Sequence, residues 1–75
     1  MPAAYHVHAI WDDEAKVWCS QSNIPGLVIE ADTLAEFESL MVQLAPEILA
    51  ENANIHNTRV PVDFRFSGTR EFAVA

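Results

Sequence analysis

Two histidines near the start of the chain are spaced to act together. His6 and His8 stand at positions i and i+2 of an alternating segment, so a strand would place both imidazoles on one face. Two such imidazoles can bind one metal ion, with a third ligand from His56 or from the acidic turn 12–14. No recognised metal motif supplies that ligand, so we predict no metal site and no cofactor. The alternative is a domain that binds a small molecule or metal between helix and sheet through His6 and His8.

The remaining reactive side chains do not form a catalytic pattern. Cys19 is the single cysteine, and a cysteine in a strand is more often a small core residue than a nucleophile. Asp12 and Asp13 are typical of a turn, and Asp32 and Glu36 are typical of a helix start. With only two glycines, the chain has no glycine-rich phosphate loop. We therefore predict that the protein is not an enzyme.

Composition indicates one small acidic globule. The 75 residues are about half of a typical domain, so we expect a single domain over 1–75. Apolar residues make up 51% and the net charge is −7, which predicts a packed core and argues against binding nucleic acid alone. The single cysteine, the N-terminal stretch without a signal-peptide pattern and the lack of a long apolar run predict a cytoplasmic protein with no membrane contact. So small a domain without disulfides favours a homodimer or higher homo-oligomer.

Hydrophobic periodicity predicts a hairpin, a turn and a third strand in the first part of the chain. Residues 5–11 alternate as a strand does, and 17–20 resume a β pattern after a short charged turn. Pro25 and Gly26 are the residue types favoured at the two central positions of a type II turn. The apolar run 27–31 is suited to a third strand.

A long amphipathic helix is predicted next. Thr33 is a good N-cap, Glu36 completes a capping box, and apolar residues recur at intervals of three and four beyond it. Pro46 lies inside this pattern and predicts a kink rather than a break. Residues 60–66 alternate as a strand, and the apolar tail 71–75 could add a fifth strand or reach another subunit. The prediction is an α+β fold, β-β-β-α-β, with the helix on one face of an antiparallel sheet.

Large aromatic residues and an uneven distribution of charge indicate a surface for a protein partner. Residues 1–58 contain nine acids and one Lys, whereas 59–75 contain three Arg and two acids. A strongly acidic region followed by a mildly basic one could self-associate head to tail or bind a basic protein, although a solvated surface would show the same charge. Aromatic anchors are favoured at interfaces, although all could also belong to the core. The candidate interface residues are Tyr5, Trp11, Trp18, Phe64, Phe66 and Phe72.

Several short motifs resemble those of a known family. They are Trp-Asp-Asp-Glu-Ala-Lys-Val-Trp at 11–18, Ile-Pro-Gly-Leu-Val at 24–28 and Ala-Asp-Thr-Leu-Ala-Glu at 31–36. In this order they resemble the HicB-like antitoxin superfamily. Leu-Ala-Pro-Glu-Ile-Leu at 44–49 and Arg-Val-Pro-Val at 59–62 are similar to a short bacterial branch of it, described only as a domain of unknown function. The usual Asp-Leu-Pro-Gly-Cys turn of the family is Asn-Ile-Pro-Gly-Leu here, at 23–27.

The resemblance implies both a fold and a role. The fold is three antiparallel strands, a helix and a fourth strand. The role is that of a non-catalytic antitoxin module that binds a small mRNA-cleaving toxin and blocks its active site, usually in a dimer or higher assembly. Full antitoxins of the family add a DNA-binding segment. No helix-turn-helix pattern follows the strand at 60–66, so we expect no binding to an operator.

Overall fold

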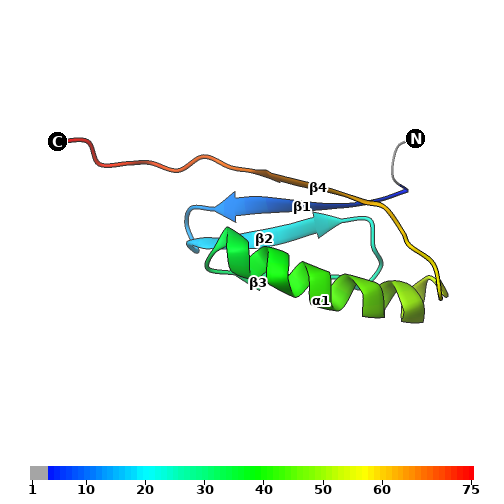
Figure 1. Ribbon diagram of the computed structural model, residues 1–75. Helices are drawn as coiled ribbons and strands as arrows, with labels where there is room; N and C mark the ends of the chain where they lie inside the picture. Colours follow the sequence, from blue (N-terminus) through cyan, green and yellow to red (C-terminus); the bar gives the residue numbers. More distant parts are fainter. Residues whose placement is uncertain (1–3) are drawn as a thin grey trace.

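The computed structural model describes residues 4–75 and has an α+β fold with the predicted element order β-β-β-α-β (Figure 1). Met1 to Ala3, which belong to the N-terminal stretch used above for localisation, lie outside the described residues. The elements are β1 (Tyr5–Asp12), β2 (Val17–Ser22), β3 (Glu30–Ala31), α1 (Leu34–Asn52) and β4 (Val62–Ser67).

The sheet has the strand order β3-β2-β1-β4 and is mixed rather than fully antiparallel. β1 pairs with β2, and β2 with β3, in antiparallel fashion, whereas β4 lies parallel to β1. The prediction of an antiparallel sheet is therefore wrong at this last pair. The reason is topological: α1 carries the chain back along the sheet from β3, so β4 must run in the same direction as β3, and hence as β1.

The turn after β2 has the geometry that its residue types predict. The Leu27 amide donates to the Ile24 carbonyl at 3.2 Å, and between them Gly26 has φ of 85°, as the third position of a type II turn requires. The third strand is much shorter than the apolar run 27–31. Before β3, a side-chain hydrogen bond takes the place of a backbone ladder bond: the Ser20 Oγ accepts from the Ile29 amide at 2.8 Å. The Ser20 amide in turn donates to the Ile29 carbonyl.

The helix begins where the capping residue predicts. Thr33 is the N-cap, and its hydroxyl accepts from the Glu36 amide at 3.1 Å. The helix is 19 residues long and continues through Pro46, so the prediction that Pro46 does not break it is confirmed.

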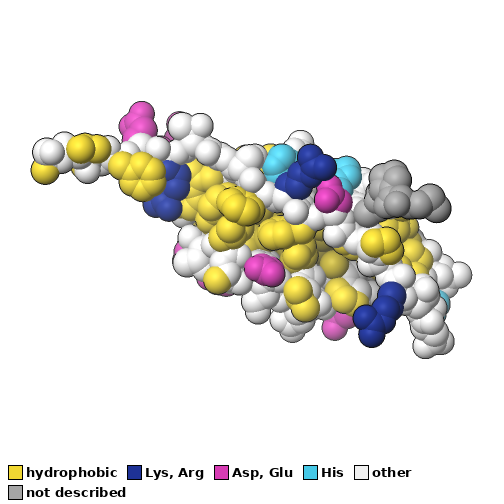
Figure 2. Space-filling model, turned by 45° about the horizontal axis from the view of Figure 1, so that its top comes forward, with side chains coloured by type: hydrophobic (Ala, Val, Ile, Leu, Met, Phe, Trp, Pro, Cys, Tyr) yellow, Lys and Arg dark blue, Asp and Glu magenta, His cyan; other side chains and the backbone are white. Residues whose placement is uncertain are grey.

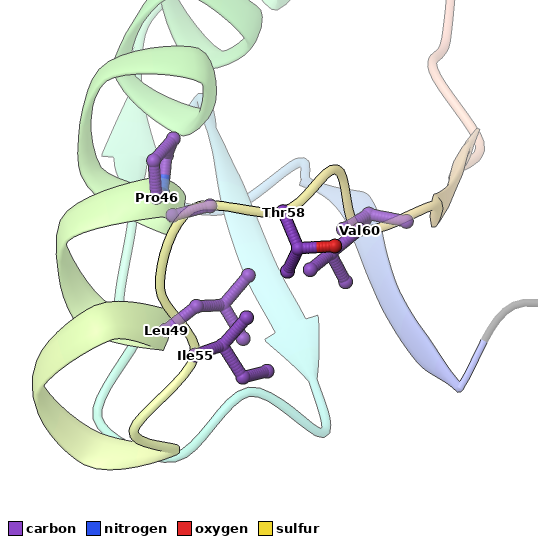
Figure 3. Close-up of a pocket in the computed structure, with 7 residues that line it drawn as sticks. Pro46, Leu49, Ile55, Thr58 and Val60 are labelled. Carbon is purple, nitrogen blue, oxygen red and sulfur yellow. The ribbon is translucent and has the colours of Figure 1, made fainter.

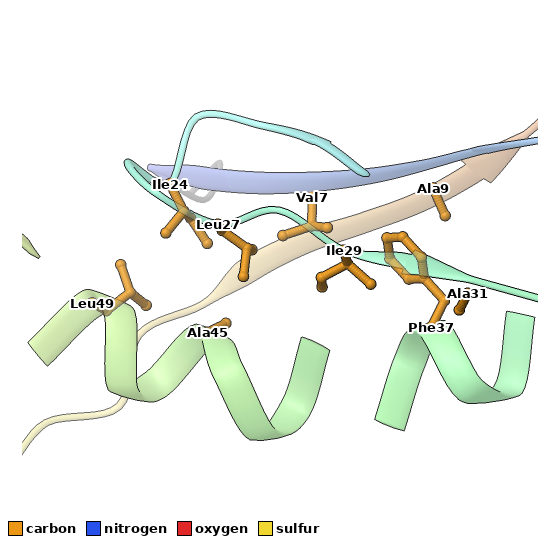
Figure 4. Packing of buried hydrophobic residues seen from close by; sticks show 9 residues of the cluster. All are labelled: Val7, Ala9, Ile24, Leu27, Ile29, Ala31, Phe37, Ala45 and Leu49. Carbon is orange, nitrogen blue, oxygen red and sulfur yellow. The ribbon is translucent and has the colours of Figure 1, made fainter. Parts of the chain in front are cut away.

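The core lies between α1 and one face of the sheet (Figure 4). From the helix, Phe37, Ala45 and Leu49 point towards the sheet and the turn that precedes β3. From β1, Val7 and Ala9 have no exposed surface, and Trp11 on the same face is 8% exposed. The face away from the helix carries the alternate residues of β1, among them His6 and His8. The two faces of β1 therefore differ as the sequence alternation predicts.

The C-terminal segment extends away from the body (Figure 1). Residues 68–75 form neither helix nor strand, so the suggested fifth strand is not present within this chain. The molecule measures 53 × 24 × 17 Å, and its radius of gyration of 14.0 Å exceeds the ~11 Å expected for a compact chain of this length. Strand pairing requires a neighbouring edge, and β1 already ends at Asp12, opposite the first tail residues. Over residues 4–75, no helix combines the length and the apolar character needed to cross a membrane.

Candidate protein interface

Three aromatic side chains from three strands gather at one end of the helix-side face. Trp11 of β1 is the register partner of Trp18 of β2, and their ring centroids lie 5.4 Å apart. Trp18 meets Phe66 of β4 edge-on at 6.2 Å. We call Trp11, Trp18 and Phe66 the aromatic cluster. It lies beside the start of α1, because Trp18 also pairs with Ala31 just before the helix.

Arg70 extends the aromatic cluster towards the C-terminus. Its guanidinium lies 4.4 Å from the centre of the Trp11 ring and 5.9 Å from that of Phe72. No motif in the sequence marks Arg70 as a contact residue. Continued alternation from Phe64 and Phe66 would have placed it on the aromatic face, but Gly68 interrupts the strand pattern. This cation–π contact joins the extended tail to the body.

Asp13 anchors the cluster from the hairpin turn. Its carboxylate accepts from the Trp11 indole at 2.9 Å and from the Lys16 ammonium at 3.0 Å. These two bonds, the indole first, hold the pKa of Asp13 below its usual value. Trp11 is thereby fixed between a carboxylate at its edge and a guanidinium over its face.

The six predicted interface residues divide between core and surface. Trp11 is buried, Phe66 is 60% exposed and Phe72 is 77% exposed. Phe64 is half-buried and stacks on Phe37 of the helix, with centroids 6.2 Å apart. Tyr5 is half-buried at the far end of β1 and packs against the core. The structure thus brings Trp11, Trp18, Phe66 and Phe72 together, whereas Tyr5 lies apart from them.

Hydrophobic side chains form a band along this side of the molecule (Figure 2). The exposed apolar residues of the C-terminal part are Phe66, Phe72 and Val74, the last 90% exposed. The acids at 12 and 14 in the hairpin turn are exposed near Trp11, and the acids of α1 are exposed as well. An apolar centre with a charged surround is the usual anatomy of a protein interface.

The two histidines lie on the opposite face of the sheet. His6 and His8 are register partners of Asp63 and Arg65 in β4, and His8 Nε2 lies 2.9 Å from the Ser67 hydroxyl. Within residues 4–75, no three His, Cys, Asp or Glu side chains form a group that could hold a metal ion. His56, suggested as a third ligand, has its Nε2 3.1 Å from the Asn54 side-chain oxygen.

An apolar pocket does lie between the helix and the chain that leads into β4 (Figure 3). It has a volume of about 200 Å³ and is lined by Ala45, Pro46, Leu49, Ile55, Thr58, Val60 and Val62. His6 and His8 do not line it, because they alternate with the residues that face the helix. The suggested ligand site between helix and sheet through these two histidines is therefore wrong in its geometry.

Cys19 lies on the same face as the histidines, opposite Ile10 in β1 and Glu30 in β3. Desolvation raises the pKa of its thiol, and the carboxylates of Glu30 and Asp12 raise it further. A nucleophilic cysteine needs the reverse shift, because the thiolate is the reactive form. The surroundings of Cys19 therefore oppose its activation.

The chain is similar to proteins of unknown function. A family model described as a domain of unknown function, DUF1902, matches residues 4–74. A hypothetical protein from the extremely thermophilic bacterium Thermus thermophilus has a similar crystal structure, with a TM-score of 0.67 and 38% sequence identity. The alignment covers 92% of this chain and 96% of that one. No curated protein matches.

Proposed function

This chain belongs to the DUF1902 family, a family of unknown function, and we propose that it is a non-catalytic, oligomeric protein-interaction module of the HicB antitoxin type. Its partner would be a small, basic, mRNA-cleaving toxin. The observation that carries the proposal is the aromatic cluster, in which a 60% exposed Phe66 packs edge-on against Trp18, which in turn packs on Trp11. Aromatic side chains are enriched at protein interfaces, and a few of them supply much of the binding energy.

Charge supports a basic partner. An enzyme that cleaves mRNA must bind phosphates, so its active site carries positive charge. Residues 1–58 of this chain contain nine acids and one Lys. The exposed Asp12 at the end of β1 and Glu14 in the turn that follows lie close in sequence to Trp11 of the aromatic cluster. A surface with this charge would steer and retain a basic toxin and would cover the surface that the toxin uses for RNA.

Growth rescue tests the proposal. The proposal predicts that a gene for a small basic protein lies beside the gene for this chain. When the two are expressed together, we expect the chain to restore growth that the partner alone arrests. Purified chain should likewise stop RNA cleavage by the purified partner. Phe66→Ser should abolish both effects because it removes the exposed anchor. The matched control is Val28→Ser, since Val28 is 81% exposed but lies outside the aromatic cluster.

Two results would count against this function. One is a parent chain that neither rescues growth nor inhibits cleavage. The other is a Phe66→Ser variant that is folded by circular dichroism and as active as Val28→Ser, since the aromatic cluster would then not be the binding surface.

A further inference from the structure

The outer edge of β4 and the C-terminal tail have no strand partner within residues 4–75. β4 is the last strand in the order β3-β2-β1-β4, so only one of its edges is paired within residues 4–75. The chain then continues as an extended segment beyond the end of β1 (Figure 1). Open edges with exposed apolar residues tend to pair with another strand. Here Phe66, Phe72 and Val74 are 60%, 77% and 90% exposed.

The two faces of β4 continue into the tail. Phe64 and Phe66 are register partners of Val7 and Ala9, so the even-numbered residues of β4 face the helix side. Arg70 lies over Trp11, which belongs to the same face, and Phe72 is next to Arg70. The even-numbered residues therefore share one face from Val62 to the tail. Arg65 and the other odd-numbered residues belong to the face of His8.

The sequence of this segment is self-complementary about Gly68. Read outwards from Gly68 in the two directions, Ser67 corresponds to Thr69, Phe66 to Arg70, Arg65 to Glu71, Phe64 to Phe72 and Val62 to Val74. In an antiparallel pair of two such segments, each residue would stand opposite its correspondent. The even face would pair valine with valine, phenylalanine with phenylalanine, and Phe66 with an arginine, whereas the odd face would pair Arg65 with Glu71.

We propose that two copies of this chain pair antiparallel along β4 and the tail, with Gly68 of each copy at the two-fold axis. This pairing joins two sheets into one and covers the free edge of β4. Every correspondence occurs twice by symmetry, so two Arg65–Glu71 pairs form. Cross-strand aromatic pairs and opposite charges both stabilise antiparallel strands.

Gly68 suits the position at the axis. A Cβ built on it would lie 2.5 Å from the Cβ of Trp11, so the backbone passes directly against the aromatic cluster there. The tail is thereby held in line with β4 as it leaves the body, and it presents the edge of residues 69–74 to a second copy.

This inference deepens the oligomeric part of the proposed function and does not require the toxin. The Arg65–Glu71 pairs lie on the face away from the aromatic cluster. Charge substitutions at these positions therefore probe the dimer while leaving Phe66 and Trp18 in place. Arg65 also donates to Asp63 of its own chain at 2.9 Å, so Glu71→Arg is the cleaner of the two probes. Growth rescue and dimer formation can consequently fail separately.

A charge exchange tests the pairing. The mass of the parent in solution, measured by sedimentation equilibrium, should be that of a dimer. Arg65→Glu and Glu71→Arg should each weaken dimerisation by roughly tenfold or more, because each places two like-charged pairs across the axis. The double variant Arg65→Glu, Glu71→Arg should recover most of the loss. Arg59→Glu is the matched control, because Arg59 is exposed but precedes β4 and so lies outside the paired segment 62–74.

Cysteine pairs test the register. In chains that carry Cys19→Ser, a mixture of Ser67→Cys and Thr69→Cys proteins should form a mixed disulfide on mild oxidation, because directly opposite Cβ atoms are about 5 Å apart. A mixture of Ser67→Cys and Ala75→Cys proteins should not. A monomeric parent, single charge variants that dimerise like the parent, a double variant without recovery, or the absence of the first disulfide would each overturn the proposal.

Discussion

At the scale of single residues, Trp11 connects most of the features that matter for function. Its indole donates to Asp13 at 2.9 Å, its ring packs on Trp18, and its face receives the Arg70 guanidinium. The side chain is itself buried. It therefore supports the exposed residues indirectly, through Trp18, which packs against Phe66, and through Arg70, which lies near Phe72.

Asp13 makes the stability of the fold depend on pH. Its pKa is lowered in the folded protein, first by the Trp11 bond and then by the Lys16 bond. A carboxyl group of this kind stabilises the fold above its unfolded pKa, and the contribution is lost as pH falls through the lower folded pKa. The stability advantage of the parent over Asp13→Asn, measured by urea unfolding, should thus be present at neutral pH and disappear in strong acid. Glu14→Gln is the control, because Glu14 accepts neither bond. An advantage that grows on acidification would contradict this assignment.

At the scale of elements, a side-chain hydrogen bond joins the turn before β3 to the end of the helix. The Asn52 side chain donates to the Pro25 carbonyl at 2.9 Å, and a Cβ on Gly26 would lie 2.8 Å from the same amide nitrogen. The turn thus depends on glycine twice: for its positive φ of 85° and for the space beside the helix.

Gly26→Ala should therefore destabilise the protein by about 1–3 kcal/mol, as expected for a strained non-glycine residue. Urea unfolding measures the loss. The double variant Gly26→Ala, Asn52→Ala removes the close contact and leaves the backbone strain, so it separates the two causes. A Gly26→Ala protein as stable as the parent would show that the turn can relax at no cost.

At the scale of the whole molecule, the folded body that ends with β4 and the tail 68–75 contribute separately to the free energy of unfolding. The core is built from residues 7–49, with half-buried support as far as Phe64, and the tail contacts the body through Arg70. The body should therefore fold without the tail, whereas the elongated shape should depend on it.

A chain that ends at Gly68 tests this division. We expect an unchanged circular dichroism spectrum and an altered tryptophan fluorescence. At concentrations low enough for the parent to be monomeric, we expect a stability loss of about 0.5–1 kcal/mol, the usual worth of an exposed cation–π contact. Its radius of gyration, measured by X-ray scattering, should be about 11 Å, the value of a compact chain of this size. An unfolded truncated chain would show instead that the tail is part of the body.

Local sequence was sufficient for the order and type of the elements. Thr33 marked the helix start, Pro25 and Gly26 marked the turn, and period-two alternation marked β1 and β4. Local sequence did not predict the length of β3. The Ser20 Oγ accepts a hydrogen bond from the Ile29 amide in place of a backbone ladder bond, and a hydrophobicity pattern carries no information about such a bond. The continuous helix through Pro46 was likewise predictable from its unbroken apolar pattern.

The sequence indicated which aromatic residues could belong to an interface. It did not indicate which of them come together in the folded chain. Trp11 and Trp18 are joined by the predicted hairpin, whereas Phe66 lies much further along the chain and reaches them only because β4 lies beside β1. The parallel direction of β4, the separation of Tyr5 from the aromatic cluster and the contact of Arg70 with Trp11 follow from the same arrangement. Periodicity reports which face of a strand a residue occupies, whereas the neighbour of that strand is chosen by packing between segments distant in sequence, and that choice is made only in the tertiary structure.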